Sequence, residues 1–225
     1  RDRRVGRSRR LLAASEAPVT PIPDSRIIVA VRARSVLRAV ALGGTALAVG
    51  AWTSAGPGRR LDLEAFREGN RDRGPAADRF FGGVTELGSI WASVGAAAVV
   101  AATGHRRAAA RGLAAASLTW IAGQALKRVF GRPRPYDANL DGMTLRIERP
   151  NGTSWPSSHP AVLVSFLTVT SKDLGAGAVA RTAMDGLATV IGASRVYVGV
   201  HFPSDVAGGI LLGKSVAAAF DGDRR

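Results

Sequence analysis

The stretch SRVYVGVHFPSD, residues 194–205, contains an arginine, a histidine and an aspartate within the eleven residues 195–205. His201 and Asp205 are four residues apart, so a helical turn that begins at Pro203 would bring the carboxylate to Nδ1 of the imidazole. That contact would leave Nε2 of His201 available as a base or a nucleophile. Arg195 adds a forked cation that suits phosphate oxygens. The same residues also fit a structural ion-pair network at a helix junction, so the stretch alone leaves both interpretations open.

The composition narrows the classes of partner. The 225 residues suffice for one domain with a large core, and 46% of them are hydrophobic. A net charge of +14 indicates an anionic partner, namely nucleic acid, a phospholipid surface or a phosphorylated substrate. Aromatic residues make up 6% and do not interleave with the basic runs, which argues against nucleic acid. The sequence contains no cysteine, which excludes disulfides, thiolate catalysis and cysteine-ligated zinc.

The chain divides into a basic tail, an apolar helical domain and a short end. We expect residues 1–34 to form a flexible, arginine-rich tail, because they contain too little apolar surface to bury. Residues 55–86 are expected to be an exposed connection with a short amphipathic piece at 61–66, and residues 221–225 a short C-terminal tail. Between 35 and 220, six apolar segments are predicted to be helices: 35–54, 87–104, 112–126, 160–171, 182–197 and 206–220.

These segments predict an all-α fold, specifically an integral membrane bundle with six short spans. Most of them are shorter than the roughly twenty residues that a bilayer core requires, so a soluble helical bundle is the alternative. Their many Ala and Gly residues favour the close packing by which membrane helices associate. Lys and Arg are more numerous on the side that carries both termini than in the loops 55–86 and 127–158. The protein is therefore predicted to be multi-pass, with cytoplasmic termini and with both long loops outside.

Two further clusters of polar residues lie at the ends of apolar segments. Lys127 and Arg134 bound a run of four cations, in which Gly131 and prolines stop the helix and turn the chain. Both cations can thereby converge on one anion, although such a run also fits a solvated helix cap. The sequence WPSSHP, residues 155–160, then opens the fourth segment. A serine and backbone N–H groups at a helix start form an anion site, although a plain N-cap beside a partly buried histidine fits as well.

Together the three clusters read Lys-x6-Arg-Pro, Pro-Ser-x-His and Ser-Arg-x5-His-x3-Asp, and the predicted topology places all three on one side. Over about residues 87–220 this pattern resembles the type 2 phosphatidic acid phosphatase superfamily, which also includes bacterial acid phosphatases, glucose-6-phosphatase and the vanadate haloperoxidases. The resemblance implies the acid phosphatase/vanadium haloperoxidase-like helical core. Ser158 stands where the family usually has glycine, so its amide can bind phosphate only if its side chain points away.

The resemblance also implies the roles of individual residues. Three cations would clamp a phosphate, a serine and an amide would complete the cradle, one histidine would attack, the other would protonate the leaving alkoxide, and an aspartate would orient the nucleophile. In that order, these residues are Lys127, Arg134 and Arg195, then Ser157 and Ser158, then His201, His159 and Asp205. Such a set of donors can stabilise a phosphoryl group in transfer without a metal.

The sequence therefore predicts a membrane phosphatase that hydrolyses a lipid phosphate monoester or pyrophosphate through a phosphohistidine, without a metal or another cofactor. The resemblance suggests phosphatidate, phosphatidylglycerophosphate or a polyprenyl (pyro)phosphate as substrates, with the site on the outer face of the cell membrane. Three alternatives remain: a phosphotransferase with the same site, a non-catalytic membrane protein that binds anionic lipid, and a soluble phosphatase.

One further pattern fits the calcium-loop template D-x-N-x-D-G-x5-E, with Asp137, Asn139, Asp141 and Glu148 as the candidate ligands. Prolines before this pattern and the sequence RPNG after it leave no flanking helices, so a full EF-hand is not expected. The alternative is a turn-rich loop whose acids balance neighbouring arginines.

Overall fold

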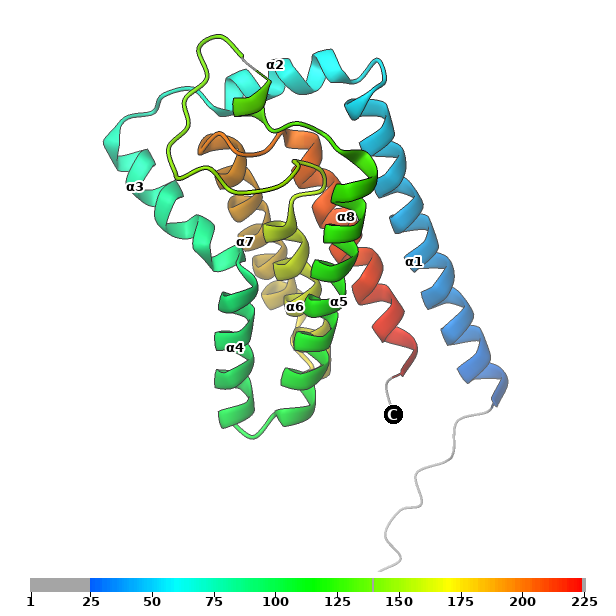
Figure 1. The fold of residues 1–225 in the computed structure, drawn as a ribbon. Helices are drawn as coiled ribbons and strands as arrows, with labels where there is room; N and C mark the ends of the chain where they lie inside the picture. The colour runs from blue at the N-terminus through cyan, green and yellow to red at the C-terminus, as the bar shows by residue number, and fades with distance from the viewer. Residues whose placement is uncertain (1–24, 139, 224–225) are drawn as a thin grey trace, which may run out of the picture.

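The computed structural model describes residues 25–138 and 140–223 (Figure 1). These residues form eight α-helices and three short 3-10 helices, and none of them lies in a β-strand. In chain order the elements are α1 (Ser25–Ser54), α2 (Arg59–Gly69), α3 (Pro75–Val84), η1 (Thr85–Gly88), α4 (Ile90–Ala102), α5 (Arg106–Phe130), η2 (Pro135–Asp137), α6 (Ser158–Asp173), α7 (Ala178–Tyr197), α8 (Pro203–Ala219) and η3 (Phe220–Asp223). The predicted all-α fold is confirmed.

Each of the six predicted apolar segments corresponds to a helix, and two of the polar segments around them are more helical than predicted. Because α1 begins at Ser25, residues 25–34 are helical and do not belong to a flexible tail. The rest of the predicted tail, residues 1–24, lies outside the described residues. The connection 55–86 is also more ordered than expected, since it contains α2, α3 and η1. In α2, buried Asp62 and Phe66 face the bundle, which explains why a largely polar segment adopts a fixed position.

The number of membrane spans stays a prediction. Within the described residues, only Val29–Ser54 is both long and apolar enough to cross a bilayer as a single helix. A second candidate combines Pro75–Gly88 with Ile90–Ala102, two pieces that meet at a 65° bend. Among the other predicted spans, α6 has 16 residues and α8 has 17, which is shorter than the roughly twenty residues a span requires.

The helices pack around α6, which is buried along most of its length. Val162 and Phe166 on α6 contact small residues of α4 and α5, whereas Leu163 and Val164 contact α7. Helix α8 packs against another side of α6, and α1 packs along the outside of α8 (Figure 1). The first turn of α6 is therefore held from several directions at the end of the bundle covered by α2 and the loop 131–157 (Figure 1).

Trp155 joins the outer helix α1 to the rest of the bundle. Its side chain is completely buried, and its ring centroid lies 4.0 Å from that of Phe130. The indole fits between α1 and α8 because both helices present glycine to it. A Cβ added at Gly50 or at Gly208 would lie 2.6 Å from an atom of the indole. This packing fixes the segment that leads from Ser154 into α6.

Candidate active site

The three motifs lie at the same end of the bundle, as the sequence predicts. Helix α5 ends at Phe130, where Gly131 adopts a left-handed conformation with φ of 56°, and the chain turns back across the end of the bundle. The first turn of α6, the last turn of α7 and the first turn of α8 open toward the same region. The backbone N–H of Ser157 donates to the carbonyl oxygen of Asp205 at 2.9 Å, which ties the second motif to the third.

Three buried cations form the centre of this region, and each is held by neutral groups. Lys127 Nζ donates to the carbonyl oxygen of Thr153 at 2.7 Å. Arg134 Nη1 donates to the carbonyl oxygen of Val200 at 3.1 Å, and Arg195 Nη1 donates to Thr85 Oγ1 at 2.9 Å.

The side chains of these cations are at most 8% exposed, and among the described residues no carboxylate lies within ion-pair distance of them. Burial of positive charge without a counter-ion is costly, so this arrangement favours a bound anion. Burial, followed by repulsion from Arg134, lowers the pKa of Lys127 to about 7.

Two buried donors at fixed positions of the sequence motifs have no protein partner among the described residues. They are the hydroxyl group of Ser157 and Nε of Arg195. Buried polar groups are nearly always hydrogen-bonded, so such a cluster indicates a place where a ligand supplies the acceptors. The Ser158 side chain lies toward Gly123 on α5, where a Cβ would be 3.6 Å from its Oγ. A side chain directed at α5 is compatible with the requirement that it leave the Ser158 amide accessible.

His201 lies between Arg134 and Asp205. Its Nε2 is 3.3 Å from Nη1 of Arg134, and its Nδ1 is 3.4 Å from Oδ2 of Asp205. Because a guanidinium can only donate hydrogen bonds, Nε2 carries the lone pair and Nδ1 carries the hydrogen. Burial, followed by the charges of Lys127, Arg134 and Arg195, lowers the pKa of His201 well below its usual value. His201 is thus a neutral imidazole with its lone pair directed at the cation cluster.

His159, in the first turn of α6, lies in the field of the same cations. Burial, followed by the charges of Arg195, Arg134 and Lys127, lowers its pKa to about 3. A phosphate group among these cations would bring negative charge that opposes this shift. Protonation of His159 is therefore expected to accompany anion binding.

A buried network behind His201 includes residues that the sequence motifs did not identify. Arg132 donates from Nη1 to Oδ1 of Asp205 at 2.7 Å and from Nη2 to Oδ2 of Asp62 at 2.6 Å. Ser154 Oγ donates to the other oxygen of Asp205, and the backbone N–H of Phe202 donates to the same oxygen at 2.8 Å. Asp62 also accepts from the backbone N–H of Ser204 at 2.9 Å. Helix α2 is thereby joined to the segment that carries His201.

Of these additional residues, Arg132 could be noticed in the sequence but not assigned a role, and Asp62 could not be noticed. Arg132 lies inside the run of cations from Lys127 to Arg134, but that run does not distinguish a phosphate ligand from the partner of an aspartate. Asp62 belongs to α2, 70 residues before Arg132, and no local pattern marks it as part of the site.

The calcium-loop pattern receives no support from the described residues. Among them, no group of three or more His, Asp or Glu side chains could hold a metal ion. Asp137, Asp141 and Glu148 are exposed, and Asn139 lies outside the described residues. Tyr136 donates to the carbonyl oxygen of Pro150 at 2.7 Å, so the loop closes through a hydrogen bond that requires no cation.

Comparison with known proteins agrees with this geometry. A family model described as the PAP2 superfamily matches residues 107–220. Decaprenylphosphoryl-5-phosphoribose phosphatase of Mycobacterium tuberculosis, in strains CDC 1551 / Oshkosh and ATCC 25618 / H37Rv, is 29% identical over 96 residues. This match covers 43% of the chain and 50% of that protein, so the chain spans about half the length of the curated relatives it matches.

Two solved structures are similar to the bundle. The crystal structure of Aquifex aeolicus LpxE aligns with a TM-score of 0.63 at 30% identity, covering 70% of this chain and 92% of that one. The first transmembrane PAP2 type phosphatidylglycerolphosphate phosphatase from Bacillus subtilis aligns with a TM-score of 0.72, covering 82% and 94%; its 22% identity supports the fold alone. With the three motifs at one end of an α-helical bundle of this shape, the chain belongs to the PAP2 superfamily.

Proposed function

We propose that this protein is a membrane phosphatase that hydrolyses a lipid phosphate monoester or pyrophosphate through a phosphohistidine on His201. The observation that carries the proposal is the position of His201 beside Arg134, in a cluster of three buried cations that have no carboxylate partner among the described residues. Such a cluster suits a phosphoryl group, and the lone pair of Nε2 supplies a nucleophile for it.

In the proposed reaction, Lys127, Arg134 and Arg195 bind the phosphoryl oxygens. The hydroxyl group of Ser157 and the backbone amide of Ser158 add further donors. These donors stabilise the negative charge on the equatorial oxygens most strongly in the transition state, in which one bond to phosphorus forms while another breaks. We propose that this electrostatic stabilisation makes the reaction independent of a metal ion.

The chemical steps use the two histidines in opposite protonation states. Nε2 of His201 attacks phosphorus, the bond from phosphorus to the ester oxygen breaks, and His159 gives its proton to the leaving oxygen. Water then attacks phosphorus of the phosphohistidine, the bond from phosphorus to Nε2 of His201 breaks, and His159 accepts a proton from that water as inorganic phosphate forms. Asp205 holds the Nδ1–H of His201 and stabilises the positive charge that the ring acquires.

A lipid substrate is supported by two kinds of observation. The names of the similar proteins refer to a decaprenylphosphoryl compound and to phosphatidylglycerolphosphate. In addition, α1 is an apolar helix long enough to cross a bilayer, and its C-terminal end lies at the same end of the bundle as the candidate site (Figure 1). We propose that the acyl or prenyl tails remain in the membrane, that the termini are cytoplasmic and that the site faces outward.

Release of inorganic phosphate tests the proposal directly. Purified protein in detergent with EDTA is given phosphatidate, phosphatidylglycerophosphate and a polyprenyl pyrophosphate in parallel. We expect at least one to be hydrolysed, and we expect His201→Ala to lower kcat by on the order of a thousandfold or more. Circular dichroism would verify that the variant remains folded. Wild-type turnover in a folded His201→Ala protein would refute the assignment, and a rate abolished by EDTA would refute metal independence.

A further inference from the structure

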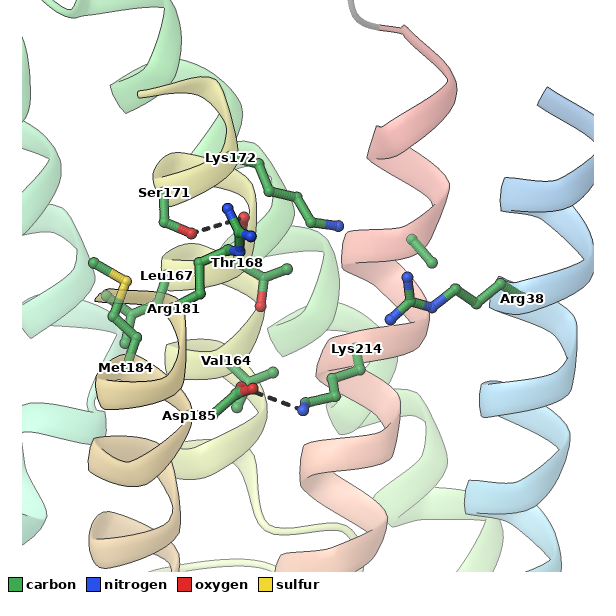
Figure 2. A pocket seen from close by; sticks show the side chains of 11 residues that line it. Arg38, Val164, Leu167, Thr168, Ser171, Lys172, Arg181, Met184, Asp185 and Lys214 are labelled. Atoms are coloured by element: carbon green, nitrogen blue, oxygen red, sulfur yellow. Dashed lines mark hydrogen bonds and ion pairs between the residues drawn. The ribbon is translucent and has the colours of Figure 1, made fainter. Parts of the chain in front are cut away.

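A second group of cations lies at the end of the bundle opposite the candidate active site. Arg38 of α1, Lys172 of α6, Arg181 of α7 and Lys214 of α8 line a cavity of about 270 Å³ (Figure 2). Figure 2 shows their charged ends directed from four different helices toward the space between them. We call this space the basic cavity.

The positive charge of the basic cavity is only partly balanced. Lys172 pairs with Asp221 at 2.6 Å, and Lys214 pairs with Asp185 at 3.2 Å. Arg181 donates to the carbonyl oxygen of Ala176, which carries no net charge. Arg38 has no carboxylate within ion-pair distance among the residues that the structure describes. Two guanidinium groups therefore remain available to an anion.

The remaining lining suits an anion that carries apolar chains. Guanidinium groups match the oxygens of a phosphate, and the hydroxyls of Thr168 and Ser171 add polar groups. Val164, Leu167 and Met184 give the same cavity an apolar wall. A free phosphate ion would gain nothing from this wall, whereas the glycerol and first methylene groups of a phospholipid would bury apolar surface against it.

The position of the basic cavity fits a lipid headgroup. Lys172 lies in the last turn of α6 and Arg181 in the first turn of α7, on either side of the connection 174–177. If the bundle is embedded as proposed above, this connection lies at the membrane surface. Basic pockets between membrane helices at this level bind the headgroups of anionic lipids.

We propose that the basic cavity binds the headgroup of an anionic phospholipid that is not the substrate. The phosphate lies between Arg38 and Arg181, and the bound lipid connects α1 to the helices α6, α7 and α8. The proposal depends on the membrane location suggested above, but not on phosphatase chemistry, because it uses no residue of the candidate active site.

Thermal unfolding and lipid titration of the purified full chain in neutral detergent test this site. The probe is dioleoylphosphatidylglycerol, a phosphodiester that a monoesterase cannot hydrolyse. Dioleoylphosphatidylcholine and inorganic phosphate serve as comparisons, since one has tails without net charge and the other has charge without tails. We expect phosphatidylcholine to leave the melting temperature unchanged and the anionic lipid to raise it. Inorganic phosphate also fits the candidate active site, so any rise that it causes should be the same in the wild type and in a variant with Arg38 and Arg181 both replaced by Gln. An equal rise with phosphatidylcholine would overturn the role of the cations, and a phosphate-induced rise that disappears when Arg38 and Arg181 are replaced would overturn the lipid.

Variants locate the binding. Replacing both Arg38 and Arg181 by Gln is expected to lower the affinity for the anionic lipid about thirtyfold. This value follows from the typical contribution of a cation near an anionic headgroup. The matched control is Arg34→Gln, which removes the same charge one helical turn away on α1 and should preserve the affinity. If the double variant does not fold, Arg38→Gln alone is used, since Arg38 has no carboxylate partner in the described part of the chain.

A further variant separates this site from the candidate active site. Arg134→Gln should lower phosphatase activity while leaving the lipid-induced rise in melting temperature unchanged. Loss of the rise in Arg134→Gln, or an unchanged affinity in Arg38→Gln, would place the lipid elsewhere and refute the basic cavity as its site.

Discussion

Asp205 is completely buried, and its two oxygens have different partners. One oxygen accepts from Arg132, while the other accepts from Ser154 and from the backbone N–H of Phe202 and lies 3.4 Å from Nδ1 of His201. The carboxylate is thus fixed by its neighbours before it acts on the imidazole. Because Arg132 in turn contacts Asp62, the orientation of His201 depends on a residue of α2.

Replacing Asp62 by Asn should therefore affect turnover although Asp62 does not contact His201. The change removes the charge that holds one side of Arg132, so Arg132 and Asp205 can shift relative to the imidazole. We expect kcat to fall roughly tenfold to a hundredfold while KM changes little, since misplacement near a reacting group costs rate more than binding.

Asp78→Asn is the matched control for this prediction. Asp78 also accepts from an arginine, Arg146, at 2.8 Å, but it lies outside the network around His201. The Asp78→Asn substitution should therefore leave kcat unchanged. An Asp62→Asn protein with normal kcat and only a lower melting temperature would show that the Asp62–Arg132 pair is purely structural.

The lowered pKa values of His159 and His201 predict a dependence of stability on pH. Folding lowers the pKa of His159 to about 3 and that of His201 well below 6.5, so the unfolded chain binds more protons than the folded chain below about pH 6.5. Stability contributed by the neutral rings is complete above that pH and is lost as pH falls. At pH 5 the loss is roughly 2 kcal/mol per histidine. Unfolding midpoints between pH 7.5 and 5 should fall less steeply in His201→Gln, and parallel curves would contradict this account.

Among the contacts between elements, the packing of α1 against the bundle depends on the absence of a side chain at Gly50, where Trp155 and Phe130 approach the helix. A Cβ at Gly50 would lie 2.6 Å from the ring of Trp155 and 2.8 Å from Phe130. Trp155 immediately follows Ser154, a partner of Asp205, so movement of the indole would be transmitted to the candidate site. This link explains how an outer helix contributes to the position of the candidate catalytic residues on α6 and α8.

Gly50→Ala is therefore expected to destabilise the bundle by about 1–3 kcal/mol, the usual cost of forcing extra volume into a packed interface. Gly44→Ala is the control on the same helix, because a Cβ there meets nothing within 4 Å. Melting temperatures in detergent should fall for the first variant and not for the second. Equal values for both would mean that α1 can shift to accommodate the methyl group.

At the scale of the whole molecule, large apolar side chains remain on the outside. On α1 these include Val36, Leu37 and Val40, each at least 57% exposed, and Trp91 of α4 is 78% exposed. Such side chains on several helices favour a lipid environment over water. Together with the apolar length of α1, they support the proposed membrane location.

Fractionation tests that location. We expect the expressed protein to sediment with membranes, to remain there in high salt and alkaline carbonate, and to be released by detergent. Retention in salt separates insertion from the surface attraction expected of a chain with net charge +14. Recovery of active protein in the detergent-free supernatant would instead favour the soluble bundle.

The all-α class, the approximate positions of six helices and the three motifs could be predicted from the sequence, because helix periodicity, helix-ending residues and motif spacing are local properties of the chain. The sequence also led from the pair His201 and Asp205 to the expected contact at Nδ1. The start of α1 at Ser25 was not predicted from the sequence. Residues 25–34 were assigned to the tail because of the arginine-rich composition of residues 1–34, although they continue the apolar helix that follows.

Which cation pairs with which acidic group became apparent only in the folded structure. Arg132 and Arg134 are two residues apart in one basic run, yet Arg132 is paired with Asp62 and Asp205, whereas Arg134 faces Nε2 of His201. Likewise, four cations from four helices meet in the basic cavity without any shared motif. Side-chain charge is written in the sequence, but its partner depends on burial and on distances between remote segments, which exist only after the helices have packed.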